Sequence, residues 1–240
     1  MTLKIYNSKQ ELADRFADFF FHFSKSKEEV YVSLSGGSTP RVFFESLTER
    51  YGSKIDWKKI HFYWGDERCV PPAAEESNYK MTRDFLLSKV DIPDSNIHRI
   101  KGENRPDEEA IAYAELLEEN LPSKNELPYF DLLILGMGDD GHTASIFPHQ
   151  IALWESDKYC EVAKHPETGQ NRISLTGKVI NNAACVVFLV TGQSKAKKLK
   201  EIIREEGAYT GYPATLVAPG SGNLIWFLDK EAASQLDSAG

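Results

Sequence analysis

The feature that most constrains the fold is an apolar run that ends abruptly in glycines and charged residues. Phe130 and the stretch 132–135 form the run, and Gly136-Met137-Gly138-Asp139-Asp140-Gly141-His142-Thr143 follows it directly. A short, continuous apolar run is typical of a strand that is buried on both faces, as in a parallel sheet. Ligands of open α/β sheets bind beyond the carboxyl ends of the strands. The sequence therefore predicts a functional site in the segment that carries His142 and the two aspartates.

The composition and net charge limit what kinds of molecule the protein is expected to bind. Of 240 residues, 41% are hydrophobic and 27% are charged, as in ordinary globular proteins. A net charge of −8 argues against a nucleic-acid surface, because binding a phosphate backbone requires a basic footprint, although a small basic pocket remains possible. Neither a signal-peptide core nor a run of membrane-spanning length is evident, so we expect a cytoplasmic protein that binds neither nucleic acid nor membrane.

The cysteines favour the same compartment. Cys69, Cys160 and Cys185 are odd in number and far apart in the sequence. This spacing predicts neither a disulfide framework nor a zinc site. A reducing cytoplasm is the environment in which such cysteines are expected.

Strand-like and helix-like patterns alternate along the chain. Helices are predicted at 9–24, from 38 or 39, from 77 or 78, at 106–121 and after 191–194; strands are predicted at 30–34, 60–64, 97–100, 130–135, 158–163, 173–176, 184–190 and 224–228; a short C-terminal helix is predicted from Asp229. No linker or repeat divides the sequence. We therefore expect one α/β domain over 1–240, with a mostly parallel sheet flanked by helices.

A glycine-rich turn follows the strand predicted at 30–34. The segment Ser35–Pro40 leads into a helical pattern, with Ser38 or Thr39 as the expected N-cap and Pro40 in the first turn. Free N–H groups and the helix dipole at such a point favour a phosphate, although a plain capped turn is the alternative. The pattern matches neither a P-loop nor a dinucleotide fingerprint. The residues expected to hold the phosphate are Gly36, Gly37, Ser38 and Thr39.

Charged residues lie beside other predicted elements. Asp66, Glu67 and Arg68 follow the strand at 60–64, where they would ordinarily form a solvated loop. Lys195 lies in the first turn of a predicted helix, where the dipole disfavours a cation by a few tenths of a kcal/mol to about 1 kcal/mol. A bound anion would explain this lysine, and a solvated side chain is the alternative.

Together these motifs resemble the family that contains the 6-phosphogluconolactonases and the glucosamine-6-phosphate deaminases, over essentially the whole chain. The segments that carry the resemblance are 35–40, Trp64–Arg68, Ser77-Asn78, 136–148, Arg172–Ser174 and Gly192–Ala196. The resemblance implies a Rossmann-like fold, as in the sugar-phosphate isomerase/deaminase superfamily. It also implies a sugar-phosphate lactone as substrate, no cofactor, no metal, and a place in the oxidative pentose phosphate pathway. We expect a monomer or a weak homo-oligomer.

The resemblance also implies catalytic roles for residues near the central segment. A δ-lactone needs only a deprotonated water and a stabilised oxyanion to open. His142 suits a general base, because an imidazole ordinarily titrates near neutral pH. Asp140 or Asp66 would orient its ring, and Arg68 would stabilise the oxyanion or bind a sugar oxygen. No nucleophile elbow is present, so we expect direct attack by water.

Two further residues complete the expected site. The resemblance implies that Arg172 and Lys195 hold the 6-phosphate together with the glycine-rich turn. No group of His, Cys and carboxylate residues has metal-ligand spacing, which agrees with a metal-independent reaction.

Two other functions remain open. An amino-sugar-phosphate deaminase or isomerase of the same family would carry Tyr where this chain has Arg68, and Asn-Glu in place of Pro148 and the residue after it. The glutamate that serves ring opening would then be missing. A non-catalytic sugar-phosphate sensor would not need the His142 cluster, and we would expect it to carry a DNA-reading or signalling module, which is not evident in this sequence.

Overall fold

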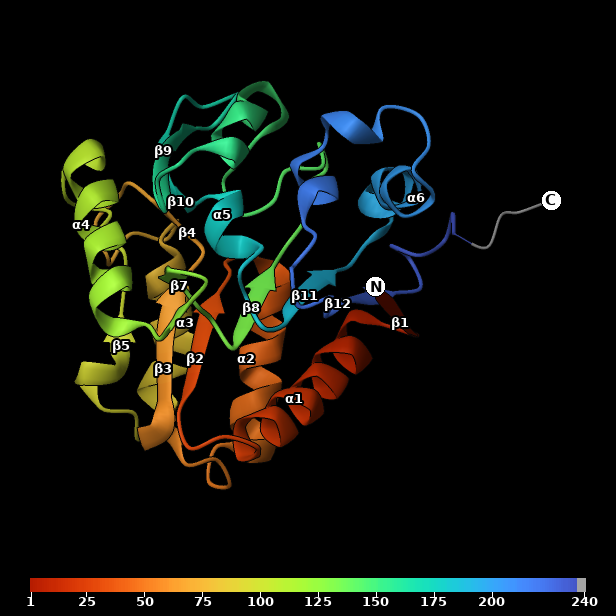
Figure 1. Ribbon diagram of the computed structural model, residues 1–240. Coiled ribbons are helices and arrows are strands. Elements are labelled where there is room, and N and C mark those ends of the chain that lie inside the picture. Colours follow the sequence, from red (N-terminus) through yellow and green to blue (C-terminus); the bar gives the residue numbers. More distant parts are fainter. Residues whose placement is uncertain (237–240) are drawn as a thin grey trace.

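A seven-stranded parallel sheet runs through the centre of the computed structural model, which describes residues 1–236 (Figure 1). In spatial order the strands are β1 (Thr2–Tyr6), β12 (Leu224–Asp229), β11 (Val186–Val190), β8 (Leu132–Leu135), β2 (Val30–Leu34), β3 (Ile60–Trp64) and β5 (Ile97–His98). Every neighbouring pair is parallel. The predicted α/β class with a mostly parallel sheet is confirmed.

The order of the strands changes direction at the centre of the sheet. From β2 the chain proceeds to β3 and β5 on one side, and it then returns to β8, β11 and β12 on the other side. The adjacent strands β2 and β8 therefore flank a topological switch point, where ligands of doubly wound sheets bind.

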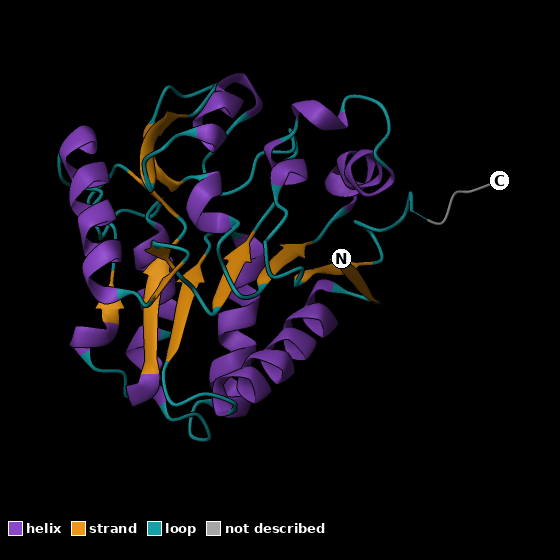
Figure 2. Cartoon of the chain, in the orientation of Figure 1, coloured by secondary structure: helices purple, strands orange, loops and turns teal. Residues whose placement is uncertain are grey.

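Helices cover the sheet (Figure 2). They are α1 (Lys9–Lys25), α2 (Ser38–Tyr51), α3 (Asn78–Phe85), α4 (Pro106–Asn120), α5 (Gly177–Ile180) and α6 (Ala196–Arg204). The aromatic stripe that predicted α1 packs inward: the Phe16 ring centroid lies 4.5 Å from that of Phe43 in α2 and 5.1 Å from that of Phe227 in β12. Aromatic pairs at these separations add to the stability that burial provides.

The apolar run at the centre of the sequence forms the core of the sheet. All four residues of β8 are buried, and Phe130 just before it is buried as well. Strand β8 lies between β2 and β11. Burial on both faces explains why this strand shows no alternation of polar and apolar residues.

A second sheet lies above the carboxyl ends of the large one (Figure 2). Strands β4 (Asp66–Arg68), β10 (Asn171–Leu175) and β9 (Cys160–Lys164) form it in that order, and both pairings are antiparallel. The alternative of a solvated loop at 66–68 does not hold, because β10 supplies hydrogen-bonding partners from about a hundred residues further along the chain. A separate two-residue hairpin joins β6 (Ser123–Lys124) to β7 (Leu127–Pro128).

Three predictions about the ends of elements are wrong. Gly37, at φ 109°, takes the N-cap position of α2 in place of Ser38 or Thr39. Helix α6 begins at Ala196 after a short 3₁₀ turn at 193–195 that follows Gly192, so it has no hydroxyl cap. Residues 230–236 form turns rather than a helix.

The end of the last strand is held by a side chain. The carboxylate of Asp229 accepts hydrogen bonds from the backbone N–H groups of Ala232 and Gly192. These bonds explain the turn that replaces the predicted helix. Strand β1, which the sequence analysis did not predict, pairs with β12 at the edge of the sheet and is half exposed, so it lacks a continuous apolar signal. Within residues 1–236, none of the helices combines the length and the apolar character that crossing a membrane requires.

Candidate active site

A cavity of about 210 Å³ opens at the carboxyl ends of the central strands. Its lining brings together segments that follow β2, β3, β8 and β11, together with Arg172 of β10 and Asn78 of α3. Of the predicted site residues, the lining contains Gly36, Gly37, Asp66, Arg68, His142, Arg172 and Lys195. The predicted position, at the topological switch point, is therefore where the structure gathers these side chains.

An adjoining hollow of about 170 Å³ shares Gly36, Gly37 and Lys195 with the cavity and is lined in addition by Ser38 and Thr39. Both hydroxyls have protein partners: Lys9 Nζ donates to Ser38 Oγ at 2.9 Å, and Thr39 Oγ1 lies 2.7 Å from Thr191 Oγ1. A larger groove of about 540 Å³ lies between α4 and β9 and contains none of the predicted residues.

His142 and Asp140 form the central pair of the site. Nδ1 of the imidazole lies 2.6 Å from Oδ1 of Asp140, and the backbone N–H of His142 donates to the same oxygen at 3.0 Å. Partial burial raises the pKa of Asp140, but the hydrogen bond and the charge of His142 outweigh it and lower that pKa to about 2. The carboxylate is therefore ionised at neutral pH and accepts the Nδ1 proton, which leaves Nε2 as the nitrogen able to accept a proton.

Glycine at position 138 allows this arrangement. A Cβ atom on Gly138 would lie 2.1 Å from Nδ1 of His142 and 2.7 Å from Oδ1 of Asp140. The backbone N–H of Gly138 also donates to the carbonyl of His142 at 2.9 Å, which closes the turn. The imidazole ring packs against Phe147, with centroids 4.5 Å apart.

The structure distinguishes between Asp140 and Asp66, the two carboxylates that the sequence analysis considered as partners of His142. Asp66 lines the cavity, but its Oδ2 accepts the hydroxyl of Ser145 at 2.6 Å. The N–H of Ser145 in turn donates to Ser174 Oγ at 3.1 Å. Asp66 thus ties the central segment to the small sheet, and Asp140 is the carboxylate bonded to the imidazole.

Arg68 and Arg172 lie directly opposite each other on β4 and β10. Both line the cavity, and the Nε atom of each is buried without a hydrogen-bond partner among the described residues. Burial, together with the charge of Arg68, lowers the pKa of Arg172. Like charges placed opposite each other on adjacent strands destabilise a sheet. Their persistence here indicates a site for an anion.

Lys195 is the third cation of the cavity. Its Nζ lies 2.7 Å from Oδ1 of Asp139, and the side chain of Asp139 is 69% exposed. Hydrogen bonds from Lys195 and Ser194 lower the pKa of Asp139. An exposed carboxylate that neutralises the lysine can move away when another anion binds.

The sequence analysis missed the role of α3. Buried Glu67 accepts hydrogen bonds from the backbone N–H groups of Asn78 and Tyr79 at 2.7 and 2.8 Å, and from the hydroxyl of Ser77 at 3.0 Å. These bonds dock the first turn of α3 onto β4 and bring Asn78 to the cavity wall. The resemblance marks Ser77-Asn78 as a motif without giving Asn78 a role, and the docking of α3 onto β4 shows that Asn78 lines the cavity.

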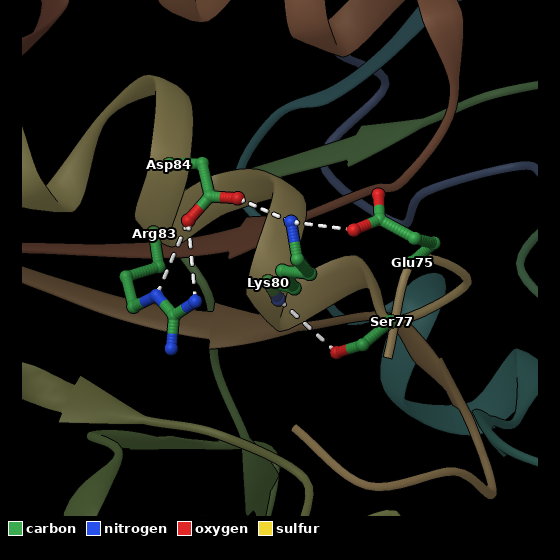
Figure 3. A network of polar contacts seen from close by, with 5 residues as sticks. All are labelled: Glu75, Ser77, Lys80, Arg83 and Asp84. Atoms are coloured by element: carbon green, nitrogen blue, oxygen red, sulfur yellow. Dashed lines mark hydrogen bonds and ion pairs between the residues drawn. The ribbon is translucent and has the colours of Figure 1, made fainter. Parts of the chain in front are cut away.

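Charged side chains on the surface of α3 hold the same turn (Figure 3). Ser77 Oγ accepts the N–H of Lys80 at 3.1 Å, and Lys80 Nζ lies 3.2 Å from Glu75 and 2.6 Å from Asp84. Exposed ion pairs contribute little stability individually, so the buried Glu67 is the stronger anchor.

The part of the chain that the structure describes contains no cluster of three or more His, Cys, Asp or Glu side chains arranged to hold a metal ion. The cavity instead collects hydrogen-bond donors and cations: Arg68, Arg172 and Lys195.

Comparisons with known proteins agree on one family. The family model for glucosamine-6-phosphate isomerases/6-phosphogluconolactonase matches residues 7–226. The chain is 44% identical over 232 residues to a 6-phosphogluconolactonase of Haemophilus influenzae, covering 96% of this chain and 98% of that protein. It is 40% identical over 225 residues to a 6-phosphogluconolactonase of Treponema pallidum, covering 94% and 93%. The solved structure of devB protein superimposes with a TM-score of 0.92 at 41% identity, covering 98% and 99%.

Proposed function

This chain belongs to the glucosamine-6-phosphate isomerase/6-phosphogluconolactonase family, and we propose that its cavity hydrolyses 6-phosphoglucono-1,5-lactone to 6-phosphogluconate. The reaction is that of a carboxylic ester hydrolase in the oxidative pentose phosphate pathway. One observation carries the proposal: a histidine that is paired with an ionised aspartate lines the same cavity as two arginines whose Nε atoms have no partner within residues 1–236. The first group activates water, and the second binds an anionic substrate.

His142 is the general base. Asp140 holds the proton on Nδ1, so Nε2 takes a proton from a water molecule as the water oxygen attacks the lactone carbonyl carbon. The resulting imidazolium is stabilised by the carboxylate of Asp140. When the tetrahedral intermediate collapses, the bond from the carbonyl carbon to the ring oxygen breaks, and the imidazolium returns the proton to that oxygen. The products are a free hydroxyl and a carboxylic acid, which then releases its proton to the solvent and becomes the carboxylate, without an acyl-enzyme.

The three cations of the cavity bind the phosphate and stabilise the oxyanion. Arg172 and Lys195 bind the 6-phosphate, assisted by the backbone of Gly36 and Gly37 and by the first turn of α2, which contains Ser38 and Thr39. Arg68 lies opposite Arg172 and supplies positive charge to the oxyanion that develops on the lactone carbonyl. The reaction needs neither a cofactor nor a metal, because a general base and fixed positive charge suffice to open an activated ester.

The proposal extends to the setting of the enzyme. It includes a monomer or a weak homo-oligomer as the working unit. The three cysteines form no disulfide, which supports a reducing, cytoplasmic setting.

An assay on two substrates tests the function. The purified protein is mixed, in the presence of a chelator, with freshly prepared 6-phosphogluconolactone, and the rate is corrected for spontaneous hydrolysis. A parallel sample with glucosamine 6-phosphate is assayed for ammonia. We expect rapid, chelator-resistant lactone hydrolysis and no ammonia. Ammonia release without lactone hydrolysis would replace the proposal with the deaminase, and activity that requires a divalent ion would overturn the metal-free mechanism.

A further inference from the structure

We propose that the side-chain oxygen of Asn78 accepts a hydrogen bond from one ring hydroxyl of the sugar lactone and so contributes to substrate specificity. This inference rests on the proposed lactonase function and adds a specificity-determining residue to it. Asn78 begins α3 and lines the cavity, although its own surface is only 2% exposed.

The hydrogen bonds around Asn78 determine which way its carboxamide points. Nδ2 donates to the backbone carbonyl of Asp66 at 2.9 Å. A carbonyl oxygen can only accept, so the nitrogen must face Asp66 and the amide cannot be flipped. The backbone of Asn78 is occupied as well: its N–H donates to Glu67, and its carbonyl accepts the hydroxyl of Thr82. The side-chain oxygen is thereby turned away from α3.

That oxygen points toward the glycine-rich turn after β2. A Cβ atom on Gly36 would lie 1.8 Å from Oδ1 and 2.3 Å from Cγ of Asn78. Both residues line the cavity, so the absence of a side chain at Gly36 leaves Oδ1 beside the substrate space. No side-chain or backbone donor among the described residues bonds to this oxygen.

The cavity needs such an acceptor. Arg68, Arg172 and Lys195 are donors only, and they suit a phosphate and a carbonyl oxygen. A sugar lactone also presents hydroxyl groups, each of which has a proton to donate. The side chains in the cavity wall that carry oxygen acceptors are Ser35, Asp66 and Asn78, and the hydroxyl of Ser35, which can rotate, donates to the carbonyl of Gly36 at 3.4 Å. Since one oxygen of Asp66 is already bonded to Ser145, Asn78 provides a neutral acceptor in a fixed position.

Deoxy substrates combined with a variant test the inference. The 2-deoxy, 3-deoxy and 4-deoxy forms of 6-phosphoglucono-1,5-lactone are compared with the parent lactone, using kcat/KM for the wild type and for Asn78→Ala. In the wild type, loss of the hydroxyl that Asn78 binds should lower kcat/KM by about tenfold. In Asn78→Ala, kcat/KM for the parent lactone should fall by a similar factor. The parent and the lactone that lacks this one hydroxyl should then have similar kcat/KM values.

The controls separate recognition from structural support. Asp84→Ala removes a surface ion pair with Lys80 from the same helix, at a side chain that does not line the cavity, and should leave all three deoxy penalties as in the wild type. If Asn78 had a purely structural role, Asn78→Ala would lower kcat/KM for every substrate by one common factor, and each deoxy lactone would keep its wild-type penalty. That outcome would overturn the inference. The inference would also be overturned, without any variant, if the wild type hydrolysed all three deoxy lactones with kcat/KM within twofold of that for the parent. Asn78→Ser serves as the second variant if Asn78→Ala does not fold. Hydrolysis of the parent lactone by the wild type reports the proposed function independently.

Discussion

The Oδ1 atom of Asp140 accepts two hydrogen bonds from His142, one from Nδ1 at 2.6 Å and one from the backbone N–H at 3.0 Å. The imidazole is therefore fixed in position and in tautomer by a single carboxylate oxygen. The side chain of His142 remains 25% exposed, at the cavity. This pair converts an ordinary histidine into an oriented base.

Asp140→Asn should lower kcat by roughly 10²- to 10⁴-fold, because the amide no longer holds the proton on Nδ1 or stabilises an imidazolium. KM should change little, since Asp140 does not line the cavity. The pKa of Asp140 is lowered to about 2, so its carboxylate stays charged until the pH falls toward that value. The fall of wild-type activity on mild acidification should therefore not come from Asp140. Steady-state kinetics corrected for spontaneous hydrolysis check this, and a kcat within threefold of wild type would contradict the role of the pair.

Gly138→Ala should abolish most activity in a protein that still folds. The added methyl group would occupy the space of Nδ1 of His142 and Oδ1 of Asp140, so the ring must move. Displacement of a base by about 1 Å can cost on the order of 100-fold in rate. Gly211→Ala is the matched control, because nothing lies within 4 Å of a Cβ atom at that position. Circular dichroism and kcat would be measured for both, and equal activity would show that the close approach is unnecessary.

Arg172→Met should weaken substrate binding and stabilise the free protein. The variant removes the like-charge pair with Arg68 and a buried Nε that lacks a partner in the described part of the chain, so Tm should rise. KM for the phosphorylated lactone should rise about 10- to 100-fold, because a charge-assisted hydrogen bond is lost. Glucono-1,5-lactone without the phosphate should be hydrolysed at nearly the same rate as by the wild type.

Lys195→Met provides the contrast for that experiment. Lys195 has an ion-pair partner in Asp139, so its removal should raise KM without raising Tm. Inorganic phosphate should raise Tm of the wild type more than that of either variant. If Arg172→Met lowered Tm and reduced the hydrolysis of both lactones by the same factor, Arg172 would be a structural residue and not the phosphate ligand.

Acid stability should depend on His98, which does not line the cavity. Its ring stacks on Tyr63 with centroids 4.3 Å apart, and burial together with the charge of His61 lowers its pKa to about 4. A histidine with a lowered pKa stays neutral in the fold while the unfolded chain takes up a proton. Stability is therefore complete above the ordinary value near 6.5, and it falls as the pH drops from there toward about 4.

The measurement is Tm across that pH range for the wild type and His98→Phe, which keeps a stacked ring. The variant should lose less stability than the wild type on acidification. Replacement of the exposed His22 by Gln serves as control and should leave the slope unchanged. Identical slopes for the wild type and His98→Phe would show that His98 does not carry the acid sensitivity.

The sequence predicts the parts of the site that depend on local pattern. The apolar run of β8 identifies a buried strand. The glycines after β2 and β8 identify turns at the carboxyl ends of these two strands. Parallel strands bring such turns together, so the meeting of Gly36, His142 and Lys195 follows from the fold class alone. The motif resemblance extends this to Arg68 and Arg172.

Long-range pairing is what the sequence could not predict. Asp66–Arg68 form a strand only because β10 pairs with them, and the register that sets Arg68 against Arg172 has no local signal. The same holds for the choice between Asp140 and Asp66 as the partner of His142, which depends on where Ser145 lies. Ser38 and Thr39 look like helix caps in isolation, yet their hydroxyls bond to Lys9 and Thr191 from distant elements.

The pH–rate profile of His142→Asn tests the central claim most directly. The variant keeps a similar size but cannot accept a proton, so kcat should fall by roughly 10²- to 10⁴-fold. The loss of activity on acidification that a general base predicts for the wild type should be absent from the variant. Affinity for 6-phosphogluconate, measured by calorimetry, should remain close to that of the wild type, because other residues hold the phosphate. A variant with near wild-type kcat and an unchanged pH profile would contradict the account and remove His142 from the mechanism.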